Sequence, residues 1–108
     1  MLEPLFGNRV MEKILFYLLT YESGYIRGIS AAFGVPVNGI TQQLKRLEDG
    51  GIISGQKKGK IRLYTFNPRY PFLPELKAIL QKAMDGLPEA ELERFYRQRT
   101  RPRRKGKP

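Results

Sequence analysis

The 108-residue sequence contains no cysteine and no histidine. Without cysteine, the chain has no disulfide framework, no thiol nucleophile and no thiolate metal site. Without histidine, it lacks the commonest general base near neutral pH and the commonest protein ligand of transition metals. The sequence therefore excludes sensing of soft metals through its own thiolate or imidazole groups, and it predicts no cofactor.

Long apolar runs are also missing. The longest one, Ile14 to Leu19, has six residues, whereas a membrane-spanning helix needs about 20. The first residues, Met1 to Leu5, lack the basic stretch followed by an apolar stretch that marks a secretory signal. We therefore expect a soluble, cytoplasmic protein with no membrane partner.

Acidic residues are scarce, since 20 Lys and Arg stand against 10 Asp and Glu and give a net charge of +10. The excess is unevenly distributed. Residues 27–62 carry a net +5 and residues 94–108 a net +8 with no acid, whereas residues 1–26 and 63–93 are slightly acidic. A chain of this length forms one small domain. Two basic stretches on it favour a polyanionic partner.

Three amphipathic helices are predicted in the first half of the chain. Residues 8–21 form the first, with Asn8 as its N-cap and apolar residues at spacings of three and four. A short second helix over residues 25–33 ends at Gly34-Val35-Pro36. The third runs over residues 37–49, with an inner stripe of Val37, Ile40, Leu44 and Leu47.

The first helix carries more apolar surface than one face can hold, because Phe16, Tyr17 and Tyr21 lie off its main stripe. A helix that is apolar nearly all round is buried on more than one side. The second cover is either another subunit or the C-terminal helices of the same chain, and the sequence leaves both open.

A β-hairpin is predicted directly after the third helix. A strand begins at Ile52, residues 56–60 form a basic turn, and residues 61–66 alternate as a second strand. Further helices are expected over residues 74–85 and 89–97. Residues 99–108 contain two prolines and many cations, and we expect them to be disordered.

The predicted order is helix, helix, turn, helix, hairpin, helix, which is that of a winged helix-turn-helix. The expected fold class is mainly α with a small β-hairpin (α+β), with additional C-terminal helices. Residues 1–98 form the domain and residues 99–108 a basic tail.

The third helix points to DNA. A helix fits the major groove, where amides and hydroxyls read base edges and cations reach guanine or phosphate. Its water-facing residues Asn38, Thr41 and Gln42 are the candidates for base edges. Lys45 and Arg46 are the candidates for phosphates, and either is also long enough to reach a base.

Other cations form the rest of the predicted DNA-binding set. The basic hairpin, or wing, over residues 56–62 suits the flanking backbone or the minor groove, and Arg27 on the second helix suits a phosphate. The wing contributes Lys57, Lys58, Lys60 and Arg62. The tail is either a solvated end or an arm that binds phosphates, and it contributes Arg99, Arg101, Arg103, Arg104, Lys105 and Lys107.

Four segments resemble the winged-helix domains of the ArsR/MarR-like bacterial and archaeal transcriptional regulators: Leu5–Asn8, Tyr25–Ile29, Ile40–Ile53 and Tyr64–Pro68. The most specific is Leu44–Ile53, in which the third helix ends in Leu-Lys-Arg-Leu-Glu and is followed by a turn and two apolar strand residues. The resemblance implies a homodimer joined through the first and last helices, which represses or activates nearby genes.

Two functions remain open from the sequence. The first is a homodimeric regulator that binds double-stranded DNA sequence-specifically. The second is a winged-helix module for protein interaction or RNA binding, because a fold alone does not determine function. We predict no enzyme, since His and Cys are absent, the acids are scattered over helix surfaces, and no phosphate-binding glycine loop is present.

Overall fold

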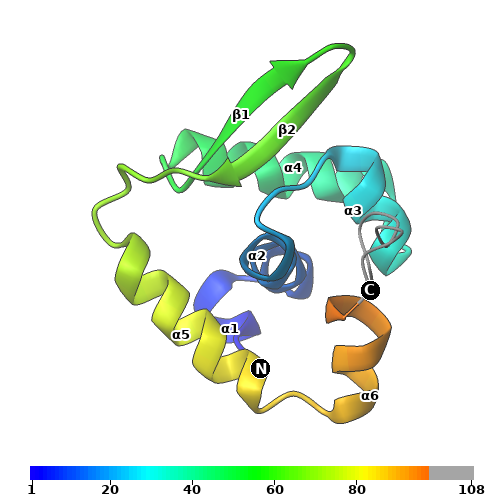
Figure 1. The fold of residues 1–108 in the computed structure, drawn as a ribbon, viewed down its shortest axis with the longest axis vertical. Coiled ribbons are helices and arrows are strands. Elements are labelled where there is room, and N and C mark those ends of the chain that lie inside the picture. The colour runs from blue at the N-terminus through cyan, green and yellow to red at the C-terminus, as the bar shows by residue number, and fades with distance from the viewer. Residues whose placement is uncertain (98–108) are drawn as a thin grey trace, which may run out of the picture.

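The computed structural model describes residues 1–97 (Figure 1). The predicted basic tail, residues 99–108, lies outside the described residues. The elements follow one another as α1 (Glu3–Phe6), α2 (Arg9–Tyr21), α3 (Ile26–Phe33), α4 (Val37–Asp49), β1 (Ile53–Lys58), β2 (Ile61–Phe66), α5 (Leu73–Asp85) and α6 (Glu89–Glu91), and a π-helical turn over Leu92–Tyr96 continues α6. The predicted fold class, mainly helical with one small hairpin, is confirmed. None of the helices described is long and apolar enough to cross a bilayer.

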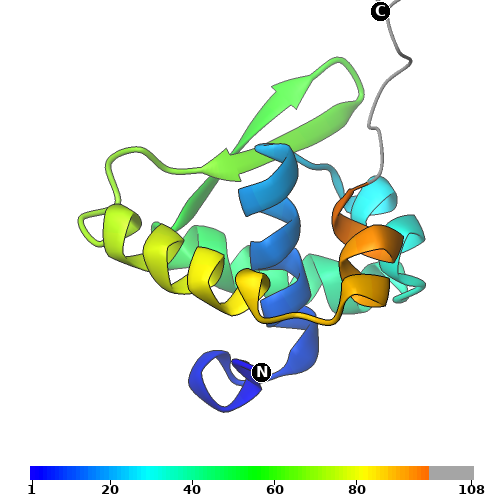
Figure 2. The same ribbon diagram turned by 60° about the horizontal axis from the view of Figure 1, so that its bottom comes forward.

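Helix α2 lies at the centre of the domain, between α5 on one side and α6 on the other (Figures 1 and 2). Its N-terminus is capped as predicted, because Asn8 Oδ1 accepts a hydrogen bond of 2.7 Å from the backbone N–H of Met11. Ile14, Leu15 and Leu18 are almost completely buried, and they form the centre of the core.

The second side of α2 is covered by the same chain, which decides between the two alternatives left open by the sequence. Phe16, off the main stripe, is 2% exposed. The ring of Tyr96 stands edge-on to it, with 5.7 Å between centroids. Phe95 in turn lies 5.1 Å from Phe33 on α3 and accepts a 2.6 Å hydrogen bond on its carbonyl oxygen from the Tyr21 hydroxyl.

Helices α3 and α4 form the helix-turn-helix, at the predicted bounds to within one residue. Gly34 ends α3 in the left-handed conformation, with φ of 66°, as its place at a helix C-terminus predicts. Ile40, Leu44 and Leu47 of the predicted inner stripe are buried. Val37 is 38% exposed, so its place in that stripe was wrong. It is the first residue of α4, beyond the part of the helix that rests on the core.

The hairpin is longer and its turn shorter than predicted. β1 continues through Lys58, and β1 and β2 are antiparallel with a register from Ile53↔Phe66 to Lys58↔Ile61. The turn is therefore Gly59-Lys60, and the expectation of a turn over residues 56–60 was wrong. Gly59 has a φ of 63°, and a left-handed residue at the first turn position allows a two-residue connection.

Two features had no signal in the sequence pattern. α1 is a single turn, too short to show a helical period. The second is an isolated bridge in which the backbones of Gly24 and Tyr64 exchange hydrogen bonds of 3.0 and 2.8 Å. A Cβ on Gly24 would lie 2.8 Å from a ring carbon of Tyr17, so only glycine allows this approach.

Candidate nucleic-acid interface

The outer face of α4 carries a row of exposed polar side chains. Asn38, Thr41, Gln42 and Lys45 are all exposed. At about 100° per residue, Lys45 lies roughly 20° around the helix from Asn38, so these four residues share one face. The side chains of Asn38, Thr41 and Gln42 make no hydrogen bond with any residue in the described range 1–97. Their donors and acceptors are therefore available to an external partner.

The two cations of α4 differ in their surroundings. Lys45 Nζ pairs with Asp49 Oδ2 at 3.2 Å, and both side chains are mostly exposed. Such a surface pair is weak and easily exchanged for another anion. Arg46 lies about 80° around the helix from Asn38, and its Nη1 donates to Gln43 Oε1 at 3.1 Å. Gln43 Oε1 also accepts from Asn8 Nδ2 at 3.3 Å, so Arg46 leans toward the start of α2.

Arg27 and the tip of the hairpin supply cations with no ion-pair partner among residues 1–97. Arg27 is exposed on α3, the helix that packs against α4. On the hairpin the same holds for Lys57, Lys58 and Lys60. The α3 helix and the hairpin fix the backbone positions of these residues, and no acid within residues 1–97 pairs with their charges.

The hairpin cations do not share one face, because side chains alternate along a strand. The register places Lys57 and Arg62 opposite each other, on the face that carries the buried Ile53, Tyr64 and Phe66. Lys58 lies on the other face. Lys60 occupies the turn itself. The basic hairpin therefore presents positive charge on both faces and at its tip.

Arg62 is the one predicted hairpin residue that is engaged by the described part of the chain. Its Nη2 donates to Glu48 Oε2 at 2.9 Å, and the Gly55 N–H donates to the same oxygen at 3.2 Å. The hydrogen bond that Arg62 donates to Glu48 raises the pKa of Arg62 above its ordinary value. This Glu48–Arg62 bridge ties the hairpin to the C-terminal end of α4.

Gly55 makes the bridge possible. A Cβ at this position would lie 2.6 Å from Arg62 Nε and 2.8 Å from a ring carbon of Tyr64. No side chain fits there while Arg62 crosses the strand to reach Glu48. Neither Glu48 nor Gly55 was among the predicted site residues. The sequence hints at this contact only through the alternation of side chains along a strand. That alternation places Gly55 and Arg62 on one face of the hairpin, but only once the register of the two strands is known.

No protein-family model matches the chain, and no curated protein matches it. Several solved structures are similar to the chain. Reduced HlyU from Vibrio cholerae is 20% identical, with a TM-score of 0.58 over 90% of this chain and 86% of that one. A variant of ZitR from Lactococcus lactis in its apo form is 14% identical, with a TM-score of 0.52 over 77% and 71%. The adhesin competence repressor AdcR from Streptococcus pyogenes is 14% identical, with a TM-score of 0.50 over 77% and 70%.

The chain has a winged helix-turn-helix fold. The resemblance to ArsR/MarR-like regulators noted from the sequence is thereby confirmed at the level of the fold. In this fold the helix at the position of α4 is named the recognition helix, and the hairpin at the position of β1–β2 is named the wing. The predicted residues gather on these two elements, apart from Arg27 on α3 and the six tail cations, which lie outside the described residues.

The close approach at Gly55 generates a prediction. We expect Gly55→Ala to destabilise the domain by about 1–3 kcal/mol, because the added methyl group displaces Arg62 and Tyr64. Urea unfolding followed by circular dichroism measures the change. Gln56→Ala, at the next and exposed position of the same strand, is the matched control and should change stability by less than about 0.5 kcal/mol. Equal effects of the two substitutions would contradict this account of the wing.

Proposed function

We propose that the protein is a transcriptional regulator that binds double-stranded DNA sequence-specifically, with α4 in the major groove. The observation that carries the proposal is the exposed face of α4. Asn38, Thr41 and Gln42 offer amide and hydroxyl groups that no residue in the described part of the chain engages. Side chains of these types read base edges in the major groove. The winged-helix fold of the solved structures compared above supports the same function.

The recognition helix is well suited to a role that demands a fixed register. Ile40 and Leu44 anchor its inner face in the core, with exposures of 0% and 1%. Reading bases requires the helix to keep its orientation while polar side chains exchange water for base edges. The N-terminal half of α4 carries the three readers, and this half of a recognition helix meets the bases in most helix-turn-helix complexes.

Phosphate contacts are assigned to the cations around the readers. Lys45 is one turn further along α4 and is held only by a surface ion pair with Asp49. Arg46 gives one N–H to Gln43 and keeps the remaining donors of its guanidinium for a phosphate. Arg27 and the unpaired cations of the wing, Lys57, Lys58 and Lys60, bind flanking phosphates or the minor groove.

Arg62 differs from the other wing cations because it is paired with Glu48. Because Glu48 neutralises much of its charge, its contribution to DNA affinity is smaller than that of Lys58 or Lys60. Its contact with Glu48 positions the wing relative to the recognition helix. Residues 99–108 add an arm to the 1–98 domain that binds phosphates without reading sequence.

We also propose a homodimer, with an interface on α1 and α5 in place of the first predicted helix, which is α2, and the last predicted helix. The interior helix α2 offers little surface, because the chain itself covers both of its sides. In contrast, Leu5 on α1, Phe72 at the start of α5 and Ile79 on α5 are 62%, 63% and 42% exposed. They border an apolar groove of about 490 Å³ that Leu47 and Leu76 also line. Exposed apolar surface of this kind marks interfaces.

Substitutions on α4 test the function. DNA fragments selected by the wild-type chain should share a preferred sequence, and Gln42→Ala should relax that preference at one position. Lys45→Ala should weaken binding to all fragments alike and lower the slope of log K against log salt by about 1. Selection followed by fluorescence anisotropy at several salt concentrations measures both effects.

The matched control for Lys45→Ala is Lys82→Ala, which removes the same charge from an exposed position on α5. It should leave the salt slope unchanged. Binding by the wild-type chain with no preference over random DNA would refute sequence-specific recognition, and equal effects of the two lysine variants would refute the place of α4 in the interface.

The contribution of residues 99–108 to DNA affinity can be tested separately. Removal of residues 99–108 should lower the affinity for every DNA sequence by a similar factor and should leave the selected sequence the same, because phosphate contacts carry no sequence information. Anisotropy titrations of the truncated chain against the preferred site and a scrambled site measure the two factors. A loss confined to the preferred site would show that the tail reads bases.

A charged side chain introduced into the apolar groove tests whether the groove forms the dimer interface. We expect the wild-type chain to sediment as a dimer and Phe72→Asp to sediment as a monomer, since a buried, unpaired carboxylate disfavours association. Ala78→Asp introduces the same group at an exposed position of α5 that does not line the groove, and it should remain dimeric. A wild-type monomer at all concentrations would refute the dimer without bearing on DNA binding.

A further inference from the structure

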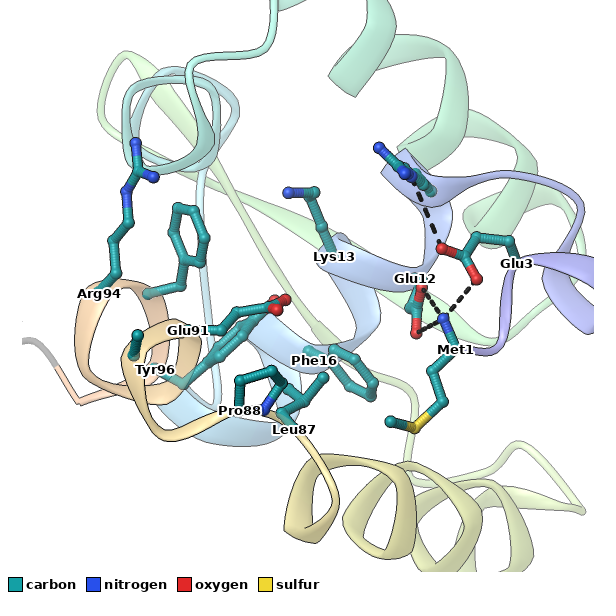
Figure 3. Close-up of a pocket in the computed structure, with 13 residues that line it drawn as sticks. Met1, Glu3, Glu12, Lys13, Phe16, Leu87, Pro88, Glu91, Arg94 and Tyr96 are labelled. Carbon is teal, nitrogen blue, oxygen red and sulfur yellow. Dashed lines mark hydrogen bonds and ion pairs between the residues drawn. The ribbon is translucent and has the colours of Figure 1, made fainter.

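A cavity of about 660 Å³ opens on the side of α2 that faces the C-terminal segment (Figure 3). Its volume falls within the range of small-molecule sites. The apolar part of its wall includes Phe16 from α2, Leu87 and Pro88 from the connection after α5, and Ala90 from α6. None of the residues assigned above to DNA contact lines it, and nothing in the proposed function uses it.

The hydroxyl of Tyr96 is left without a partner in this wall. Tyr96 is 4% exposed, and its hydroxyl has no hydrogen-bond partner among the described residues. A buried hydroxyl without a partner is costly, and native structures supply one from the protein, from water or from a ligand. Burial raises the pKa of Tyr96, and the charge of Glu91 raises it further. The group therefore stays a neutral hydroxyl, able to accept as well as donate.

Glu91 lies on the same wall as Tyr96 (Figure 3). Its half-buried carboxylate has no ion-pair or hydrogen-bond partner within residues 1–97. The other two acids of the cavity are engaged. Glu12 accepts from the Leu2 N–H at 2.9 Å and lies 3.4 Å from the Met1 amino group. Glu3 lies 3.6 Å from Arg9 Nε. The acceptor left open is therefore Glu91.

The cations that line the cavity are directed to other groups. Lys13 Nζ lies 5.3 Å from the ring centre of Phe33 and 4.9 Å from that of Phe95. The Arg94 guanidinium lies 4.9 Å from the Phe95 ring. Aromatic faces stabilise cations at such distances. A bound anion would have to draw these cations off the rings while its own charge was repelled by Glu91.

We propose that this cavity binds a small primary amine in its ammonium form. The ammonium group donates to the carboxylate of Glu91 and to the hydroxyl oxygen of Tyr96, which gives both unpartnered groups a charge-assisted hydrogen bond. The hydrocarbon part lies on Phe16, Leu87 and Pro88, in the way that lysine stems lie along apolar surface. The site is distinct from the DNA-binding face and stands whether or not the chain binds DNA.

The test uses the full 108-residue chain and n-butylammonium as the probe, at constant ionic strength. Two-dimensional NMR should show saturable shifts at residues 87–96 and at Phe16, with a dissociation constant of about 1 mM, the order for so few atoms. Butyrate and butanol match the probe in size and carry the opposite charge or none. Each should bind at least tenfold more weakly.

Two substitutions locate the interaction. Glu91→Gln should weaken butylammonium binding at least tenfold. Glu93→Gln removes the same charge two residues away, from an exposed side chain paired with Arg97 at 3.0 Å, and should change the binding less than twofold. Tyr96→Phe keeps the ring in the core, so it should not lower the Tm of the free chain. It should nevertheless weaken the binding of butylammonium three- to tenfold.

Three results would overturn the proposal. The first is the absence of saturable shifts at ten times the expected dissociation constant. The second is tighter binding of butyrate, which would indicate an anion site built on Lys13 and Arg94. The third is equal binding by wild type and Glu91→Gln, which would leave only apolar contact with the walls.

Discussion

Helix α2 occupies the middle of the domain, and apolar side chains on both of its sides are removed from water. Ile14, Leu15 and Leu18 meet the helix-turn-helix and α5, whereas Phe16 meets Tyr96 on the opposite side. Each such side chain contributes about 1.5–3 kcal/mol when fully buried. Helices α1, α3, α4 and α5 and the π-helical turn all pack against α2, whereas β1 packs against α4. The C-terminal segment is therefore part of the core.

This arrangement leaves α4 with two faces of opposite character. Ile40, Leu44 and Leu47 anchor its inner face in the core. The outer face takes no part in the core and can therefore carry polar groups. The wing is joined to the same helix through Glu48, Gly55 and Arg62. The exposed polar side chains of α4 and the cations of the wing are thereby joined through one set of contacts, which suits the fixed register on a duplex that the proposed function requires.

The charge of the chain has a clearer meaning once the structure is known. The net +5 of residues 27–62 falls on α3, α4 and the wing, the elements that the proposed function brings to DNA. The two acids of this stretch are already subtracted in that net charge, since Asp49 pairs with Lys45 and Glu48 with Arg62. The five cations that remain have no ion-pair partner among residues 1–97. In the cavity beside α2, the carboxylate of Glu91 and the buried hydroxyl of Tyr96 have no hydrogen-bond partner among residues 1–97, and the wall around them combines apolar and charged side chains.

The sequence by itself determined the helices α2 to α5, the hairpin and the outer face of α4, because helical spacing, an Asn8 cap and a Gly34 terminus are local signals. The tertiary structure alone decided that Tyr96 covers Phe16 and that the turn is formed by two residues. It also decided that Arg62 forms an ion pair with Glu48, and it buried the Tyr96 hydroxyl with no hydrogen-bond partner among residues 1–97. The position of the turn depends on the register of the two strands, which the sequence pattern left open. The other outcomes join residues that are far apart in the chain, and periodicity along a sequence carries no information about which distant faces meet.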